Sequence, residues 1–310
     1  MKILEIVTSV SFLFSIIRMT TPILYASLSY LIADLVGVSN IGIEGIMLTC
    51  ALVGVLASAA FGANAFLGLC AAMIAGALLG LLLCFIVTKL KTDATIAGIA
   101  FNIAATGGTV FVLYLAVGEK GLSSSLVSGV LPNIDIPALS NVPVIGNILL
   151  GHNVLTYIAV ILVALLALFL KKTSLGLHIR SCGENPEALR SVGVHVSRVQ
   201  YIALALSGLL AAMGGAYMSM GYVSYFVRDM VAGRGYIAIA AAALGANRPG
   251  FTLLVCILFG VADAFAVNPE TQNIGIPTEL VSTIPYIVTI VVLVIYSYKK
   301  MRDRKKIAAV

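Results

Sequence analysis

Residues 65–90 read AFLGLCAAMIAGALLGLLLCFIVTKL, and Lys89 is the only charged side chain among them. About 20 apolar residues in a helix cross the roughly 30 Å hydrocarbon core of a bilayer. Strands of a membrane barrel are shorter and alternate apolar with polar residues, which this stretch does not. It therefore predicts a transmembrane helix and decides the fold class of the chain.

Stretches of this kind recur along the whole chain. Of its 310 residues, 60% are hydrophobic and 10% are charged, and its mean hydropathy is +1.08. Soluble proteins carry about 25% charged residues. We therefore expect an all-α integral membrane protein, a polytopic bundle of about 8–10 transmembrane helices, some broken or short, in one domain over residues 1–310. The expected spans cover residues 21–36, 43–61, 65–90, 94–117, 154–170, 201–223, 251–267 and 280–298, with a half-helix at 236–246 and a marginal segment at 4–17.

The basic residues are concentrated in a few segments. Thirteen of the 19 lysines and arginines lie in the loop 171–198, in the tail 299–306 and in the turn that contains Lys89 and Lys91. Positive charge marks the cytoplasmic side of membrane proteins. We therefore expect the loop 171–199 and the tail 299–310, with the C-terminus, in the cytoplasm. This placement accounts for the net charge of +6 without a nucleic-acid partner.

No metal site or catalytic site is expected. The five cysteines and three histidines do not stand at the spacing of metal ligands. The chain contains neither the G-x-S-x-G nor the H-E-x-x-H pattern of hydrolases, and it lacks the phosphate loop G-x-x-x-x-G-K-[ST]. We expect a protein that binds no metal or cofactor, is not an enzyme and cannot hydrolyse ATP by itself.

A polar segment separates two of the apolar spans. Residues 175–198 read LGLHIRSCGENPEALRSVGVHVSR. Asn185 suits a helix N-cap, Pro186 the first helical position and Glu187 the positive end of the helix dipole, while Gly193 can end the helix. The pattern predicts a helix of about two turns on the membrane surface. An ordered helix outside the bilayer is a place for another protein to bind.

Polar side chains within or beside the spans need a reason, because such groups are costly in a membrane. Glu44 and Asn40 belong to the glycine-rich segment 37–45, which fits either a broken helix that lines a cavity or a plain turn. Asn102 fits either a solute contact or a bond between neighbouring helices. Asp263 fits a solute contact, a structural hydrogen bond or a partner arginine.

Several segments of the sequence resemble a known family. Residues 175–193, followed by 201–216, are similar to the permease subunits of ABC importers of the branched-chain amino acid and simple-sugar superfamily, and the nucleoside and simple-sugar branch is the closer match. Further matching segments are Thr21–Leu24, Gly37–Met47, Ala232–Ala241 and Ile276–Thr289, so that the resemblance covers nearly the whole chain.

The resemblance implies an importer in the bacterial cell membrane with several partners. These are a cytoplasmic ABC ATPase that binds ATP and Mg, a second permease in a heterodimer, and an extracellular or periplasmic solute-binding protein that delivers a nucleoside or simple sugar. Residues 183–193 would be the docking segment for the ATPase. Its residues are Gly183, Glu184, Asn185, Pro186, Glu187, Ala188, Arg190 and Gly193.

A pathway for a nucleoside needs polar partners and an apolar face. The candidates for the polar partners are Asn40, Glu44, Asn102 and Asp263, and those for the apolar face are Phe101 or Phe111. The alternative function is an ion-coupled secondary carrier or channel for a small polar solute, with Glu44 and Asp263 as proton or cation sites. The docking segment argues against this alternative, because such a carrier has no ATPase to bind.

Overall fold

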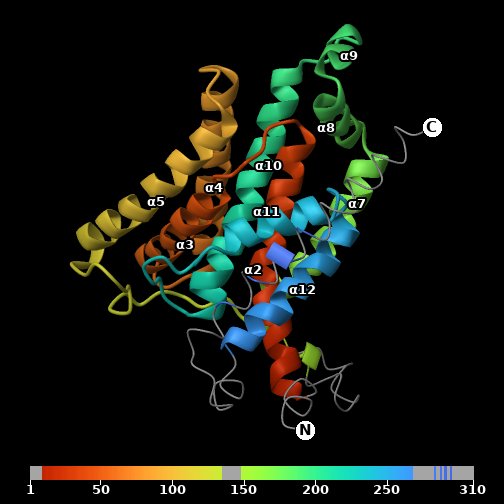
Figure 1. Cartoon of the computed structure of the whole chain (residues 1–310). Coiled ribbons are helices and arrows are strands. Elements are labelled where there is room, and N and C mark those ends of the chain that lie inside the picture. The colour runs from red at the N-terminus through yellow and green to blue at the C-terminus, as the bar shows by residue number, and fades with distance from the viewer. Residues whose placement is uncertain are drawn as a thin grey trace.

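The computed structural model describes residues 9–134, residues 148–267 and five residues between 283 and 294. It is a bundle of helices, most of which run between the same two ends of the molecule (Figure 1). Seven of the described helices are long and apolar enough to cross a membrane. They are α2 (Val10–Leu35), α3 (Ile43–Ala60), α4 (Ala65–Thr88), α5 (Ala94–Val117), α7 (Val154–Lys172), α10 (Val196–Ala216), which continues as the π-helix η2 (Tyr217–Tyr222), and α12 (Pro249–Val267).

The all-α membrane fold predicted from the sequence is confirmed. The predicted span 280–298 and the basic tail 299–310 lie outside the continuously described residues. Shorter elements complete the description. They are α8 (Ser174–Glu184), α9 (Pro186–Ser191), the short apolar helix α11 (Arg234–Leu244), and the antiparallel pair β1 (Asn133–Ile134) and β2 (His152–Asn153).

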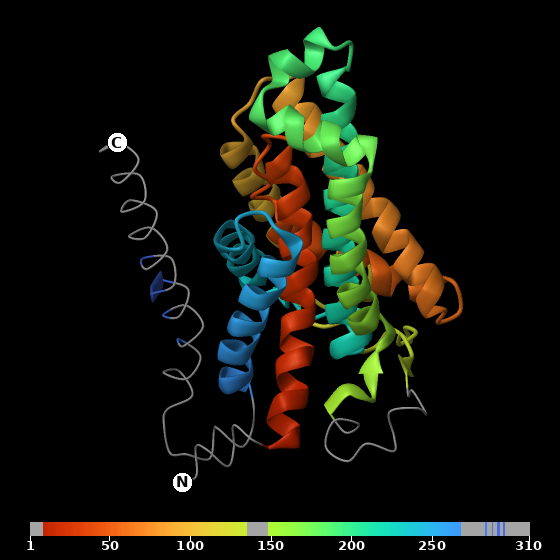
Figure 2. The same ribbon diagram turned by 90° about the vertical axis from the view of Figure 1, so that its right-hand side faces the viewer.

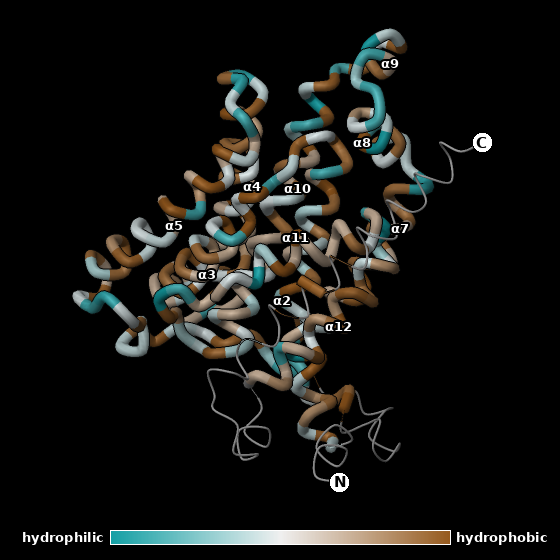
Figure 3. Tube along the Cα trace, viewed as in Figure 1, coloured by the Kyte–Doolittle hydropathy of each residue, from teal (hydrophilic) through white to brown (hydrophobic). Residues whose placement is uncertain are grey.

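The two ends of the bundle differ in character. Figure 1 shows α8 and α9 at one end, whereas α2 begins at the other. Hydrophobic residues follow the long helices, and polar residues gather around α8 and α9 (Figure 3). On α4 and α5 the outward side chains are large and apolar, as at Ile74 and Ile103, which are 63% and 69% exposed. Such faces suit lipid, as expected for membrane helices.

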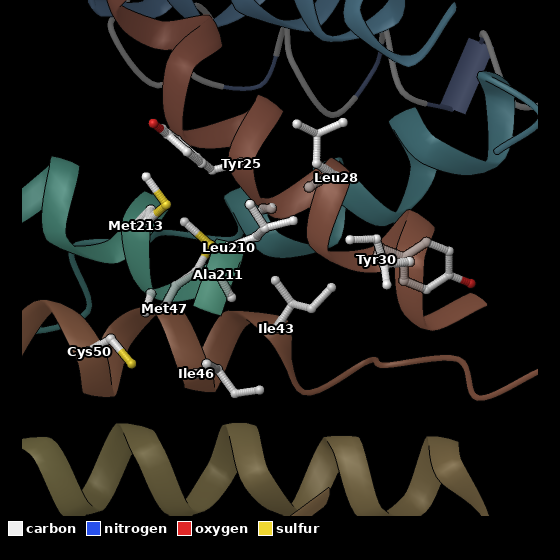
Figure 4. Close-up of a cluster of buried hydrophobic side chains, with 14 of the residues drawn as sticks. Tyr25, Leu28, Tyr30, Ile43, Ile46, Met47, Cys50, Leu210, Ala211 and Met213 are labelled. Carbon is white, nitrogen blue, oxygen red and sulfur yellow. The ribbon is translucent and has the colours of Figure 1, made fainter. Parts of the chain in front are cut away.

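The core lies where α2, α3 and α10 meet. Tyr25 of α2, Met47 of α3 and Ala211 of α10 are fully or almost fully buried, and Figure 4 shows their side chains together. The contact between α4 and α10 depends on small residues. A Cβ atom on Gly208 would collide with the carbonyl oxygen of Gly76. Glycine at these two positions therefore lets the two helix backbones approach closely.

One expectation about the N-terminal helices was wrong. The described part of the segment 4–17 is not separate from the segment 21–36, because α2 is a single helix from Val10 to Leu35. Pro22 lies inside this helix and has no N–H for the carbonyl oxygen of Arg18. The hydroxyl of Tyr217 donates to that oxygen at 3.2 Å, so a neighbouring helix replaces the missing bond.

Candidate functional site

The short surface helix predicted at the docking segment is present as α9. The side-chain oxygen of Asn185 accepts a hydrogen bond from the N–H of Ala188 at 3.0 Å, and Pro186 is the first helical residue. Gly193 has φ +82°, which glycine adopts without strain and which ends the helix. The capping pattern therefore predicted this local structure correctly. A second helix, α8, precedes α9 and was not separated from it in the sequence.

The docking segment presents polar side chains to its surroundings. Leu189 is the buried residue of α9 and anchors the helix with 4% of its surface exposed. The other side chains of the segment point away from the core. Those exposed are Glu184, Asn185, Pro186, Glu187, Ala188 and Arg190, and the backbone of Gly193 is exposed as well.

The docking segment touches the end of α2. A Cβ atom on Gly183 would collide with the carbonyl oxygen of Leu35, so α8 and α2 meet backbone to backbone. The thiol of Cys182 donates to the carbonyl oxygen of Val36 at 3.7 Å. Burial raises the pKa of this thiol above its usual range. Because of these contacts, a displacement of α8 would also move the end of α2.

Glu44 binds the start of α11. Its carboxylate oxygens accept hydrogen bonds from the N–H groups of Gly233 and Gly235, both at 2.7 Å. These amides belong to the N-terminus of α11, where the helix dipole favours a negative group. Glu44 is 9% exposed, so the carboxylate is directed at the helix rather than at a solvent-filled space.

Asn102 joins α5 to two other elements. Its Oδ1 accepts from the N–H of Gly45 at 2.8 Å, and its Nδ2 donates to the carbonyl oxygen of Ile41 at 3.0 Å and to the hydroxyl of Tyr236 at 2.8 Å. The structure therefore shows the helix-joining alternative for Asn102. It also shows that the break between α2 and α3 has two of its freed backbone groups bound by protein.

Asp263 has an arginine partner. Its Oδ2 lies 3.2 Å from Nε of Arg234, and the two side chains are 8% and 15% exposed. Arg234 also donates to the carbonyl oxygen of Val231 at 3.3 Å. The partner-arginine alternative for Asp263 is therefore the one that the structure contains.

These three residues meet on one short segment. Glu44 from α3, Asn102 from α5 and Asp263 from α12 bind the residues Gly233–Tyr236 at the start of α11. We call this segment the α11 start. Three helices that are far apart in the sequence thus fix the first turn of a fourth.

The far end of α11 is also held. Nδ2 of Asn247, just beyond the helix, donates to the carboxylate of Asp34 near the end of α2 at 2.5 Å. Between the two ends, the hydroxyl of Ser27 donates to the carbonyl oxygen of Ala238 at 3.0 Å. α2 thus forms hydrogen bonds with the middle of α11 and with a residue just beyond its end.

Asn40 and Phe101 both lie next to Gly42, in the turn before α3. Both approach Gly42, where a Cβ atom would lie 3.2 Å from Cβ of Phe101 and 3.4 Å from Oδ1 of Asn40. Asn40 is fully buried and donates to the hydroxyl of Ser207 at 3.1 Å, while its Oδ1 has no hydrogen-bond partner in the described part of the chain. Phe101 lines an apolar groove of about 620 Å³ between α3, α4 and α5.

Tyr236 and Arg234 were not identified as site residues from the sequence. The segment Gly233-Arg-Gly-Tyr236 carried a usable signal, because glycines on both sides of an arginine indicate close backbone approach. Tyr236 is 48% exposed although its hydroxyl is hydrogen-bonded to a buried amide. It is the one aromatic ring of the α11 start, and about half of its surface is exposed.

Comparison with known proteins gives the family. The sequence model of a family described as "Branched-chain amino acid transport system / permease component" matches residues 12–293. The guanosine ABC transporter permease protein NupQ of Bacillus subtilis is 32% identical over 88% of this chain and 87% of its own. TsgC13 of Haloferax volcanii, a permease assigned to glucose ABC transport, is 30% identical over 89% of this chain and 88% of its own.

The fold has a counterpart among solved structures. An inward-facing transporter assigned to the metal-chelate ABC type superposes with a TM-score of 0.53, covering 91% of this chain and 85% of that one at 14% identity. The likeness concerns the fold alone. With the family match over most of its length, the chain belongs to the branched-chain amino acid transport system permease family, and it is a transport subunit rather than an enzyme.

Proposed function

We propose that this chain is the permease subunit of an ATP-driven importer in a bacterial cell membrane and that it carries nucleosides or related simple sugars. The observation that carries the proposal is the exposed, capped helix α9, in a chain whose family match extends over residues 12–293. The similarity to a guanosine permease supports a nucleoside, and the similarity to the glucose-assigned permease keeps sugars as the second class.

The proposed partners follow from two features, the missing phosphate loop and the exposed docking segment. It has no phosphate loop, so ATP and Mg would bind on a separate cytoplasmic ATPase. The docking segment offers an exposed acid and base, Glu187 and Arg190, to that subunit. A second permease would complete the pathway, and an external binding protein would deliver the solute.

The proposed orientation rests on charge. Lys171, Lys172, Arg180, Arg190 and Arg198 all lie at the end of the bundle that carries α8 and α9. Positive charge favours the cytoplasmic side. This end and the basic C-terminal tail would therefore face the cytoplasm, where the ATPase is.

A chain of contacts offers a route from the docking segment to the candidate pathway. α8 packs against the end of α2 at Leu35, and Asp34, one residue earlier, binds Asn247 at the end of α11. The opposite end of α11 is held by Glu44, Asn102 and Asp263. In this proposal, ATP-driven movement of the docking segment shifts α2 and tilts α11, which changes access to the pathway.

The pathway residues would then act in two ways. The α11 start is bound by Glu44, Asn102 and Asp263. In this proposal these side chains hold α11 in place and become available to the solute only when α11 tilts. Oδ1 of Asn40, which accepts no hydrogen bond from the residues that the structure describes, lies near Phe101. We retain this pair as a proposed polar and apolar contact for solute.

The carrier alternative has less support. A proton or cation site needs a carboxylate that is available, yet both carboxylates are bound, Glu44 by two backbone amides and Asp263 by Arg234. An ion-coupled carrier also leaves α9 without a role. The two functions differ in whether uptake requires ATP.

The substrate class is tested by uptake. Cells with and without this chain are given labelled guanosine, uridine, ribose, glucose or leucine in separate experiments. We expect uptake of a nucleoside to depend on the chain. If only the sugars respond, the nucleoside proposal is replaced by the sugar class, and if only amino acids respond, the substrate proposal is contradicted.

A further inference from the structure

A hollow of about 850 Å³ opens between α7, α8 and α12, at the end of the bundle that carries α8 and α9. The end of α2 closes it from behind at Leu35. Figure 2 shows α7 and α12 on either side of α2, and the hollow lies near the ends of these three helices. Its lining includes neither the α11 start nor α9, and it meets the docking segment only at Glu184.

The rim of the hollow is positively charged. Lys171 comes from α7, Arg180 from α8 and Arg248 from the turn between α11 and α12, and all three are exposed. None of them forms an ion pair within the described part of the chain. Glu184 is the one carboxylate in the lining, so cations outnumber it three to one. The first turn of α12 adds the positive end of a helix dipole.

The wall below this rim is apolar. Phe251 and Leu254 of α12 line the hollow and are 57% and 61% exposed. Further along the same helix, Ile257 and Leu258 are 40% and 45% exposed, and they continue the apolar surface away from the charged rim. The hollow therefore combines a cationic edge with an apolar surface that extends along the membrane-spanning part of the bundle.

We propose that this hollow binds an anionic phospholipid. Its phosphate would lie among Lys171, Arg180 and Arg248, and its acyl chains would cover Phe251 and Leu254. Basic pockets between membrane helices on the cytoplasmic side suit such headgroups, and each nearby lysine or arginine strengthens the attraction. The proposal uses the cytoplasmic orientation of this end but does not depend on the substrate or on the ATPase.

Other occupants fit the hollow less well. Free inorganic phosphate would satisfy the cations but leave the apolar wall uncovered. The chain's own C-terminal residues 299–306 carry six lysines and arginines and one aspartate, so the cationic rim would repel them. A phospholipid satisfies both the charge and the apolar wall.

The test uses the absence of tryptophan from this chain. Phe251→Trp places a fluorophore on the exposed apolar wall, and the same complex without the substitution supplies the background from partner subunits. The assembled transporter is reconstituted in bilayers with increasing amounts of brominated phosphatidylglycerol or brominated phosphatidylcholine, whose bromine quenches tryptophan. We expect phosphatidylglycerol to bind beside the new fluorophore about tenfold more strongly than phosphatidylcholine.

Two sets of substitutions give the test its control. In the Phe251→Trp background, Lys171→Gln, Arg180→Gln and Arg248→Gln together should reduce this preference to about equal binding. The control set removes the same charge from exposed basic residues outside the hollow. It consists of Lys89→Gln, Lys91→Gln and Arg198→Gln and should leave the preference unchanged.

Each outcome decides the proposal. An equal loss in both sets means general attraction to a basic surface and overturns it. Absence of lipid quenching means that protein, either the C-terminal segment or a partner, covers the hollow, and also overturns it. If the triple variant does not assemble, Arg248→Gln alone should lower the preference severalfold, and an unchanged preference in that variant contradicts the proposal.

Discussion

Glu44 and Gly235 approach so closely that position 235 has no room for a side chain. The N–H of Gly235 donates to Oε2 of Glu44 at 2.7 Å, and a Cβ atom on Gly235 would lie 2.6 Å from that oxygen and 2.9 Å from Cα of Glu44. Since one of these neighbours is backbone, a rotation of the glutamate side chain cannot relieve the clash. The attachment of α11 to α3 therefore requires glycine at this position.

Gly235→Ala should accordingly destabilise the protein by roughly 1–3 kcal/mol, because overpacking of a tight contact forces the backbone apart. Thermal unfolding of the purified transporter in detergent measures the effect. Gly250→Ala is the matched control, because a Cβ atom there would meet nothing within 4 Å. Equal stability of the two variants would show that α11 is not clamped at Glu44.

The pair Arg234–Asp263 should show strong energetic coupling. Replacing either residue by alanine leaves the other charge buried and unpaired, which typically costs about 3–5 kcal/mol. The double variant removes both charges and should lose less than the sum of the two single variants. A double-mutant cycle on thermal stability measures the coupling. Additive losses would mean that the two side chains act independently.

Cys182 should resist alkylation. Burial raises the pKa of its thiol, and the sulfur is covered by the end of α2, so little thiolate is available near neutral pH. A water-soluble maleimide should leave Cys182 unlabelled but react quickly with Val192→Cys, because Val192 is 72% exposed beside α9. Mass spectrometry of the labelled chain gives both rates. Rapid labelling of Cys182 would show that α8 separates readily from α2.

His152 should make stability depend on pH at the opposite end of the bundle. Burial lowers the pKa of its imidazole, which stacks on Phe14 with ring centres 4.0 Å apart, and Nε2 donates to the carbonyl oxygen of Ile148 at 2.9 Å. The unfolded chain, with an ordinary histidine pKa of about 6.5, binds this proton more readily than the folded one. The contribution is therefore complete above about pH 6.5 and is lost as the pH falls below it.

Unfolding temperatures of the purified protein between about pH 7.5 and pH 5, the range over which an ordinary histidine changes charge, test this dependence. His152→Gln should reduce the loss on acidification, whereas His195→Gln, at an exposed position, should keep it. A wild-type dependence that persists in His152→Gln would assign the effect to other groups.

The parts of the fold that could be predicted from the sequence are those with local causes. The observed bounds of α5, Ala94–Val117, are the predicted ones, since Asp93 caps the helix and the apolar run ends at Gly118. The helix α9 followed in the same way from Asn185 and Pro186. The continuity of α2 through Pro22 was not predictable, because the bond that replaces the missing one comes from Tyr217, 199 positions after its acceptor Arg18.

The candidate site, too, could be predicted only in part. Glu44, Asn102 and Asp263 were identifiable as polar residues in apolar surroundings. Their common target was not, because the contacts of Glu44 and Asn102 with the α11 start cross 189 and 134 positions of sequence. Tyr236 was missed since an aromatic residue in an apolar helix carries no signal of a buried amide partner.

If a separate ATPase drives transport through α9, uptake must depend both on ATP and on the exposed side chains of that helix. Proteoliposomes that contain the assembled transporter allow ATP-dependent uptake of labelled guanosine to be measured. Glu187→Ala with Arg190→Ala should lower uptake about tenfold or more and reduce copurification of the ATPase, while the control pair Glu119→Ala with Lys120→Ala, an exposed acid and base outside the docking segment, should transport normally. The proposal that an ATPase drives transport by binding α9 would be contradicted by undiminished uptake and ATPase binding in the α9 variant. Guanosine uptake that needs no ATP would contradict it as well.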